Sequence, residues 1–297
     1  MSSSTLPPST SLPRLDGRHV LLTGATGGLG RAMAERFWQL GASLALASRP
    51  GPDLEGFIRQ FVGGLPRQEC FAAPADLSDP AAPQAIADAI GGRWDRLDVL
   101  VNNAGIVGPI GPLAGTDWAW WEQTMRINLL APVAICRLLI PLMPAGGAIV
   151  NLSGGGATGP RPNFSAYATS KAALVRFTEN LAVELAGQGI RVNAVAPGAM
   201  NTKMLDAVLE AGPAAAGHEF NKSVDQKEKG GVAPAKAAEL VAWLAGPGSA
   251  GISGRLISAV WDPWNDGLAR HREELAGSDI YTLRRITPED RGRKWNR

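Results

Sequence analysis

Short apolar runs alternate with longer segments of helical periodicity along most of the chain. The runs favour buried β-strands, and the longer segments repeat apolar residues at the three- and four-residue spacing of amphipathic helices. Alternation of this kind predicts a parallel sheet with right-handed crossovers. The predicted strands cover residues 19–23, 43–47, a run near Phe71 that ends at Asp76-Leu77, 98–101, 148–152 and 190–195, and the helices include 81–90, 117–143 and 165–186.

A glycine-rich turn follows the first predicted strand. Residues 24–30 read Gly-Ala-Thr-Gly-Gly-Leu-Gly, and Ala32, Met33, Phe37 and Leu40 then recur at helical spacing. Such a turn lets the backbone approach a pyrophosphate, and the helix N-terminus supplies N–H groups and the positive end of its dipole. The spacing differs from the commoner Gly-x-Gly-x-x-Gly. A glycine turn without a ligand is the alternative, but the strand and helix around it favour nucleotide binding.

The second predicted strand ends at Ser48 and Arg49. In dinucleotide-binding folds this position faces the adenosine ribose, where an acidic residue would accept a hydrogen bond from the 2′-hydroxyl and repel a 2′-phosphate. Ser48 carries no charge, and the Arg49 guanidinium can neutralise and hydrogen-bond a phosphate. The pair therefore favours NADP(H) over NAD(H). Alternatively, Arg49 is a loop arginine that is exposed to solvent and binds no cofactor.

Tyr167 and Lys171 lie four residues apart in a predicted helix and therefore share one helical face. A phenol has a pKa of about 10 and is a poor acid or base at neutral pH. A nearby ammonium favours the phenolate and lowers that pKa, so that the tyrosine can exchange a proton with an alcohol or ketone. A chance pair on a solvated helix is the alternative, and the surrounding motifs decide between the two.

Composition and charge restrict the class of protein. A chain of 297 residues can bury one α/β core as a single domain, and the net charge of +2 argues against a nucleic-acid surface. The positive excess lies in residues 265–297, where eight Lys/Arg accompany six Asp/Glu. Cys70 and Cys136 match no metal-ligand spacing, so no metal site is predicted. This cysteine usage suits a reducing compartment, and we expect a cytoplasmic protein.

Two segments of the sequence bear on targeting and membrane insertion. Residues 1–14 are rich in Ser, Thr and Pro and lack the charged start and apolar core of a secretory signal, so we expect them to be disordered. The longest apolar candidate, 127–143, contains polar residues and prolines, and no membrane segment is expected. Those interruptions are Asn128, Pro132, Arg137 and Pro141.

Five motifs in a fixed order connect these observations. They are Thr23-Gly24-x-x-x-Gly28-Leu29-Gly30, Asp76-Leu77, Asn102-Asn103-Ala104-Gly105, Tyr167-x-x-x-Lys171 and Pro197-Gly198-x-x-x-Thr202. With these motifs, and with Asn128 as a further match, the chain resembles the short-chain dehydrogenase/reductase family over about residues 15–260. The resemblance implies a Rossmann-type α/β fold: a doubly wound, seven-stranded parallel sheet in three layers, with residues 255–260 as its last strand.

The resemblance also implies hydride transfer between a nicotinamide and the carbonyl or alcohol of a small organic substrate. Tyr167 would donate or accept the proton of the substrate oxygen. Lys171 would bind the nicotinamide ribose and lower the pKa of the tyrosine, and Asn128 would hold a water that links Lys171 to solvent. The implied cofactor-binding residues are Gly24, Thr26, Gly28, Leu29, Gly30, Ser48, Arg49, Asp76, Leu77, Asn103, Ala104, Gly105, Tyr167, Lys171, Pro197, Gly198 and Thr202.

One position departs from the family pattern. The family has a serine thirteen residues before the tyrosine, where it donates a hydrogen bond to the substrate oxygen, but this chain has Gly154 there. Ser153 precedes it and would serve as the catalytic serine only if the glycine loop shifted. Losing one such donor typically lowers a rate by about 10²–10³-fold. The substitute donors that the sequence offers nearby are Thr158, Asn163 and Ser165.

The resemblance divides the chain into three parts. Residues 15–262 form the Rossmann-fold domain, in which 203–232 correspond to the mobile substrate lid, and residues 263–297 form a C-terminal extension. The extension either docks, over the active site or a neighbouring subunit, or is mostly mobile. Members of the family assemble as homodimers or homotetramers through their long helices, which here would be 117–143 and 165–186.

Two functions are therefore compatible with the sequence. The first is an NADP(H)-dependent oxidoreductase that acts on a small molecule with Tyr167, Lys171 and Asn128 as its catalytic residues. The second is a non-redox protein that keeps NADP(H) as a structural or sensing ligand, or reuses Tyr167 in a lyase or dehydratase, because Gly154 replaces the serine.

Overall fold

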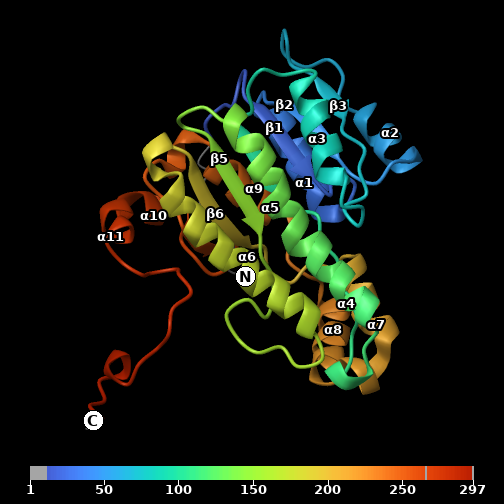
Figure 1. Ribbon diagram of the computed structural model, residues 1–297, viewed down its shortest axis with the longest axis vertical. Helices are drawn as coiled ribbons and strands as arrows, with labels where there is room; N and C mark the ends of the chain where they lie inside the picture. Colours follow the sequence, from blue (N-terminus) through green and yellow to red (C-terminus); the bar gives the residue numbers. More distant parts are fainter. Residues whose placement is uncertain (1–11, 265, 296–297) are drawn as a thin grey trace, which may run out of the picture.

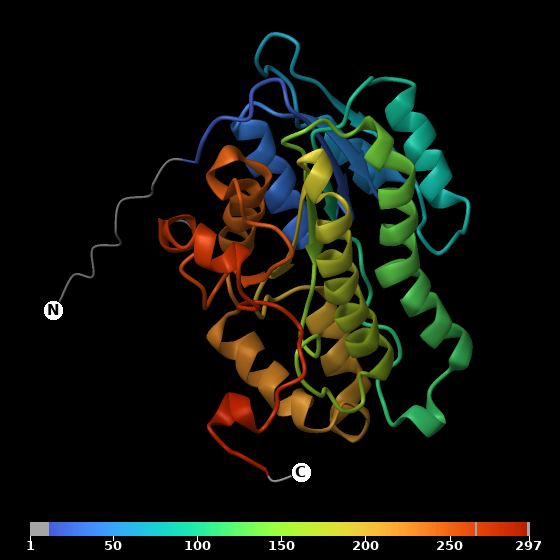
Figure 2. The same ribbon diagram turned by 60° about the vertical axis from the view of Figure 1, so that its left-hand side comes forward.

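The computed structural model describes residues 12–264 and 266–295 and contains one seven-stranded parallel sheet between two layers of helices (Figures 1 and 2). The strand order β3-β2-β1-β4-β5-β6-β7 reverses direction at β1 and β4, as in doubly wound folds. The predicted Rossmann-type sheet is confirmed. Its strands are β1 (His19–Thr23), β2 (Ser43–Ala47), β3 (Cys70–Ala72), β4 (Val99–Asn102), β5 (Ala148–Leu152), β6 (Arg191–Ala196) and β7 (Leu256–Ser258).

Alternating strand residues pack against the two helical layers. On β1, Leu22 joins the core under α1 and α9, while Leu21 faces the opposite core with α3, α5 and α6. Both side chains are fully buried. A strand covered on both faces must be apolar throughout, which explains the continuous apolar runs in the sequence. These helices are α1 (Gly28–Gln39), α9 (Pro234–Ala245), α3 (Ala82–Gly91), α5 (Ala131–Leu139) and α6 (Ser165–Glu184).

Shorter helical segments connect the main elements. The predicted third strand was too long, because β3 ends at Ala72 and leaves Asp76 in the loop before α3. The remaining segments up to the last strand are α2 (Pro52–Ile58), α4 (Trp118–Met125), α7 (Lys203–Ala216) and α8 (His218–Lys229), with short 3₁₀ turns at Leu113–Gly115, Ile140–Leu142, Ala186–Gln188 and Pro247–Ser249.

The predicted long helix at 117–143 is continuous but not uniform. A π-helical turn, Arg126–Leu130, separates α4 from α5 and contains the fully buried Asn128. π-helical turns inside α-helices frequently mark functional sites. The turn is the local feature that directs this amide inward.

The stretch Trp118–Leu142 is long and apolar enough to cross a membrane by length and composition alone, with 25 residues and a mean hydropathy of 1.6. We expected the polar residues and prolines to exclude this run as a membrane segment, but it passes the test of length and composition. A third of its most apolar window is buried, and α5 packs against α3 while α4 packs against α6. Core helices of globular proteins satisfy the same criterion.

The segment corresponding to the lid forms two helices. Gly212, with φ of +74°, and Pro213 kink α7. The following helix, α8, is the charged part of the segment, and both helices lie beside the lower end of α6 in Figure 1.

The C-terminal extension docks on the domain over part of its length. The Arg255 side chain, 7% exposed, donates to the carbonyl oxygens of Ser278 and Ile280 at 2.9 Å and also bonds that of Leu275. The Leu256 N–H on β7 donates to the Tyr281 carbonyl at 2.8 Å. The extension contains α10 (Asp266–Arg270), α11 (Arg272–Ala276) and a 3₁₀ turn at Glu289–Arg291.

This docking site lies away from Tyr167. Leu283 packs beside β7 and α6, and its N–H donates to Glu179 Oε1 at 2.5 Å. Within the described residues, the apolar cluster around Tyr167 contains no residue of the extension. At the other end of the chain, residues 1–11 of the segment predicted to be disordered lie outside the described residues, and Leu12 packs against the core.

We predict that Arg255→Ala releases residues 275–283 and lowers the free energy of unfolding by about 1–3 kcal/mol, because three carbonyl groups lose a charged donor. Hydrogen exchange of that segment should accelerate. Arg176→Ala is the matched control, since this exposed arginine also bonds the Leu283 carbonyl but is not buried. Unchanged exchange in the Arg255 variant would contradict the proposed anchoring.

Candidate functional site

The glycine turn holds the ends of β1 and β4 in close contact. Gly24 has φ of +67°, and a Cβ on it would lie 2.8 Å from the Cα of Ala104 and 2.9 Å from Nδ2 of Asn103. A Cβ on Gly30 would lie 2.9 Å from the Cα of Ala25. Gly27, which precedes α1, provides no side-chain cap for the helix, so its first N–H groups are available to an anion. The turn has the form expected of a phosphate cradle.

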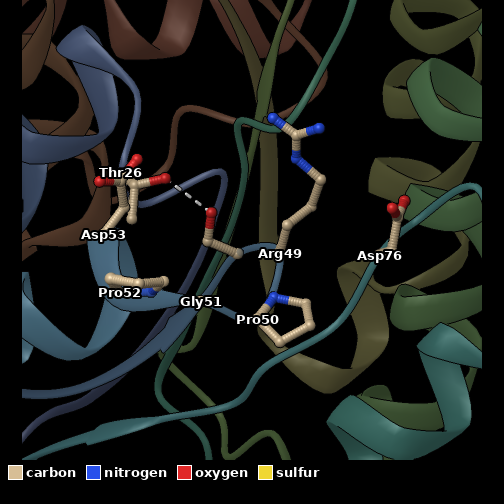
Figure 3. Close-up of a pocket in the computed structure, with 8 residues that line it drawn as sticks. Thr26, Arg49, Pro50, Gly51, Pro52, Asp53 and Asp76 are labelled. Carbon is tan, nitrogen blue, oxygen red and sulfur yellow. Dashed lines mark hydrogen bonds between the residues drawn. The ribbon is translucent and has the colours of Figure 1, made fainter.

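Beside this turn lies a cavity of about 360 Å³ that opens at the end of β2 (Figure 3). The Thr26 and Ser48 hydroxyls are 2.7 Å apart, and the Arg49 side chain extends along the cavity wall opposite Asp53. The structure thus brings together predicted residues that are separated by more than twenty positions in the sequence. The lining residues are Thr26, Ser48, Arg49, Pro50, Gly51, Pro52, Asp53 and Asp76.

Asp76 enters this cavity as a carboxylate. Its Oδ1 accepts from the N–H and the hydroxyl of Ser78 at 3.0 and 2.8 Å, and these bonds, with a smaller contribution from Arg49, lower the pKa of the carboxyl group. An ionised carboxylate can accept a hydrogen bond from a base or a sugar, and the Arg49 guanidinium partly balances its charge. Leu77, which follows, is buried in the core.

The segment after β4 is tied to β1 by side-chain hydrogen bonds. Thr23 Oγ1 accepts from the N–H groups of Asn103 and Ala104 at 3.0 and 3.1 Å, and Asn103 Nδ2 donates to the carbonyls of Thr23 and Gly24 at 2.9 and 3.1 Å. Asn103 therefore fixes the backbone of the turn. Thr23 was part of the motif but was not predicted as a site residue.

Lys171 and Asn128 meet at Gly105. A Cβ on Gly105 would lie 3.2 Å from Asn128 Oδ1 and 3.4 Å from Lys171 Nζ. Asn128 Oδ1 accepts from the Ile106 N–H, and its Nδ2 donates to the Ile106 carbonyl, both at 2.9 Å. Lys171 Nζ donates to the Leu152 carbonyl at 2.8 Å. The lysine, the buried amide and the end of β4 thus form one polar cluster in the protein interior.

Burial dominates the proton affinities of the tyrosine and the lysine. It raises the pKa of Tyr167, which is 7% exposed, and lowers the pKa of Lys171 to about 8. The expected lowering of the tyrosine pKa by Lys171 is therefore not found. The contribution that opposes burial at Tyr167 comes instead from Arg161.

Gly154 lies directly against the tyrosine hydroxyl. A Cβ on Gly154 would overlap Tyr167 Oη and lie 3.0 Å from its Cζ. The tyrosine thus occupies the space that a serine side chain at this position would need. Ser153 is buried, its N–H donates to the Val195 carbonyl at 2.8 Å, and its hydroxyl has no hydrogen-bond partner among the described residues.

Of the three predicted substitute donors, one faces solvent and one already contacts another side chain. Thr158 is exposed, and the Ser165 hydroxyl accepts from the Trp121 indole N–H at 3.1 Å. Asn163 has φ of +69° and its carbonyl accepts from the Gly111 N–H.

The segment after β6 returns to the glycine turn. Thr202, the residue before α7, places Cγ2 4.0 Å from the position of a Cβ on Gly28. Gly198 has φ of +91°, and a Cβ there would meet Val260 Cγ2 at 2.6 Å. Pro197 is half-buried beside it. These residues therefore lie where the sheet's carboxyl edge meets the first turn.

Arg161 was missed by the sequence reasoning. Its guanidinium carbon lies 4.2 Å from the ring centroid of Phe164 and 5.5 Å from that of Tyr167, and it forms an ion pair with Glu219 of α8. Nothing in its spacing from Tyr167 indicates this contact, because the loop that carries it has no regular period. Only the folded loop brings the charge to the tyrosine.

The fold, the glycine turn and the buried tyrosine–lysine cluster together define a dinucleotide-binding α/β protein. Comparison with known proteins agrees. A family model described as "Enoyl-(Acyl carrier protein) reductase" matches residues 24–259. The short chain dehydrogenase mpl6 of Monascus purpureus is 36% identical over 89% of this chain and 87% of its own length. The levodione reductase of Leifsonia aquatica is 35% identical over 80% of this chain and 91% of its own.

Solved structures give the same result. A crystal structure of levodione reductase superimposes with a TM-score of 0.74 and 29% identity, covering 86% of this chain and 99% of that one. A short chain dehydrogenase from Burkholderia cenocepacia J2315, in complex with NADP, gives a TM-score of 0.70 and 31% identity over 82% and 97% of the two chains. The chain belongs to the short-chain dehydrogenase/reductase family, a family of oxidoreductases.

We predict that Gly154→Ala lowers the free energy of unfolding by about 1–3 kcal/mol, because the new methyl group overlaps the tyrosine hydroxyl. In a Tyr167→Phe background the same substitution should cost less, since the overlapping oxygen is gone. Denaturant unfolding of the four proteins measures the difference. Gly155→Ala is the matched control, because a Cβ there has its nearest neighbour at 3.6 Å. Equal costs in both backgrounds would contradict the contact.

Proposed function

We propose that the protein is an NADP(H)-dependent oxidoreductase that interconverts a carbonyl and an alcohol on a small organic substrate. The observation that carries this proposal is the buried cluster of Tyr167, Lys171 and Asn128 at the carboxyl edge of the sheet, beside the glycine turn. A proton donor, a cation and a phosphate cradle at one edge are what hydride transfer to a carbonyl requires of a protein.

The residues present fit the cofactor. The turn at Gly24–Gly30 presents backbone and a free helix N-terminus to a pyrophosphate, and a side chain at Gly24 would clash with Ala104 and Asn103. Thr26, Ser48 and Arg49 offer hydroxyl and guanidinium donors to a 2′-phosphate in the adjoining cavity. When bound, the nicotinamide supplies or accepts the hydride.

The residues of this chain manage the proton and the position of the substrate. Tyr167 gives its hydroxyl proton to the developing alkoxide in reduction and takes it back in oxidation. Lys171, with its pKa lowered to about 8, is still largely protonated at neutral pH and supplies positive charge close by. Asn128 holds the lysine end of the cluster through its bonds to the backbone of Ile106.

An apolar carbonyl compound suits the surroundings of the tyrosine. The cluster around Tyr167 is apolar and receives residues from the loop after β4, from α7 and from α8. Because Tyr167 is 7% exposed, we expect α7 and α8 to move away to admit a substrate, as mobile lids do. The other members of the cluster are Val107, Ile110, Phe164, Met204, Ala207, Val208, Ala216 and Phe220.

A second candidate function is a non-redox NADP(H)-binding protein, either a sensor or a lyase. It is favoured by Gly154, which leaves the site without the serine donor, and by the Tyr167 hydroxyl that fills its place. This candidate predicts cofactor binding without hydride transfer. Stereospecific transfer of label from NADPH to any carbonyl compound would exclude it.

We further propose a cytoplasmic homodimer or homotetramer. Support for assembly comes from the large apolar side chains that remain exposed on α4, on the π-helical turn and on α6. They include Trp118, Trp120, Leu130 and Val183.

We predict that Tyr167→Phe lowers turnover by about 10²–10⁴-fold, the usual contribution of a positioned acid, while NADPH binding is retained. Turnover is followed by NADPH absorbance with a panel of carbonyl compounds, and binding by nicotinamide fluorescence. Tyr281→Phe is the matched control, because the chain has only two tyrosines. Unchanged turnover in the Tyr167 variant would rule out the assigned proton donor.

We also predict that Arg49→Ala weakens NADPH binding by about 10–100-fold and leaves NADH binding within a factor of about two, because only the former carries the phosphate. Titration of each nucleotide measures the two affinities. Arg59→Ala, an exposed arginine just after α2, serves as the control. Equal losses for both nucleotides would show that Arg49 does not read the ribose end.

A further inference from the structure

Arg161 is a cation held over the ring of the catalytic tyrosine. It lies in the loop between β5 and α6, and its guanidinium carbon is 4.2 Å from the ring centroid of Phe164 and 5.5 Å from that of Tyr167. Its Nε and Nη2 both lie 3.0 Å from Glu219 Oε2. The two side chains are 21% and 23% exposed, so the charges are only partly screened by solvent.

The other groups that face Tyr167 leave Arg161 with a distinct role. On its own helix, Lys171 Nζ lies 5.8 Å from the ring centroid and donates to the Leu152 carbonyl. The loop after β4 contributes Val107 and Ile110, and α7 contributes Met204, Ala207 and Val208, all apolar. From α8, Glu219 also pairs with Lys222 at 3.2 Å, and Phe220 packs into the cluster.

The physical consequence follows from charge. A guanidinium stays protonated at every working pH, whereas the pKa of Lys171 is lowered to about 8 by burial, so that lysine loses its charge in alkaline solution. A cation near the ring favours the phenolate, and an anion opposes it. Arg161 is the group whose charge lowers the pKa of Tyr167 against the effect of burial. Its counter-ion Glu219 lies on α8, which we expect to move when the site opens.

We propose that Arg161 is a positioning residue that stabilises the ionised form of Tyr167, and that Glu219 on α8 opposes it, so that the position of the lid adjusts the proton affinity of the tyrosine. The proposal rests on the proposed function only for the role of Tyr167. Arg161 also supplies a positive charge to a site in which Gly154 replaces the serine that would donate a hydrogen bond.

The chain permits a direct test without turnover. In a Tyr281→Phe background, Tyr167 is the only phenol, so tyrosinate absorbance reports its ionisation alone. The full-length protein is titrated below its alkaline unfolding pH, which circular dichroism locates. Four variants are compared in this background: Arg161→Gln, Arg161→Lys, Glu219→Gln and the control Arg93→Gln. Arg93 lies 5.0 Å from the Phe71 ring and pairs with Glu69, so it loses similar contacts at a distance from Tyr167.

The expected order of midpoints is fixed by the signs of the charges. Arg161→Gln removes the cation and raises the midpoint, or pushes it beyond the unfolding limit. Arg161→Lys keeps the charge and restores most of the shift. Glu219→Gln keeps an acceptor oxygen for Arg161 but removes the opposing charge, and therefore lowers the midpoint. Arg93→Gln leaves it unchanged.

Identical behaviour of the Arg161 and Glu219 variants and the parent, whether a shared midpoint or a shared absence of titration, would overturn the proposal. A higher midpoint in Glu219→Gln would overturn the opposing role of the carboxylate. The pH–rate profile of NADPH oxidation should move in the same directions, with kcat at neutral pH changing by about tenfold for Arg161→Gln. If no carbonyl compound is turned over, the proposed function fails, while the titration still decides the role of Arg161.

Discussion

The close approach of β1 and β4 at their carboxyl ends is the constraint on which the rest of the site depends. Gly24 leaves no room for a side chain between the first turn and Ala104, and the Thr23 hydroxyl bonds the two N–H groups that follow β4. Because the strand order reverses at this point, the crossovers leave a crevice there that side chains do not fill. The cavity at the end of β2 and the tyrosine–lysine cluster both lie beside this junction.

Burial shifts the pKa values of Tyr167 and Lys171 in opposite directions. It disfavours the charged form of each, so Tyr167 holds its proton more tightly and Lys171 more weakly. The arrangement therefore keeps the tyrosine protonated, which suits a proton donor in carbonyl reduction. Any stabilisation of the phenolate must come from charges brought close to it, and the loop that carries Arg161 supplies one.

The sequence predicted the sheet, the glycine turn and the Tyr167–Lys171 face because each depends on local order along the chain. Periodicity of two or 3.6 reports a strand or helix directly, and the motifs are contiguous or at fixed helical spacing. The length of β3 and the helices α7 and α8 were harder to predict from the sequence, because tertiary packing and not propensity sets their boundaries.

Contacts made across irregular loops could not be predicted from the sequence. Arg161 and Glu219 are separated by 58 positions and meet only because the loop before α6 folds against α8. The significance of Gly154 also changed with the structure. From the sequence it was a missing donor, whereas in the fold it is the space that the Tyr167 hydroxyl occupies. The motif shows that the serine hydroxyl is absent, whereas the folded structure shows that the Tyr167 hydroxyl occupies its space.

The π-helical turn at Arg126–Leu130 rotates the side-chain directions of α5 relative to those of α4. The turn contains one residue more than an α-helical turn requires. As a result, Trp121 of α4 faces Ser165, while Ile135 and Leu139 of α5 face the sheet. Deleting a single residue there would turn one half by about 100° relative to the other. The position of the buried Asn128 therefore depends on the length of this turn as well as on its sequence.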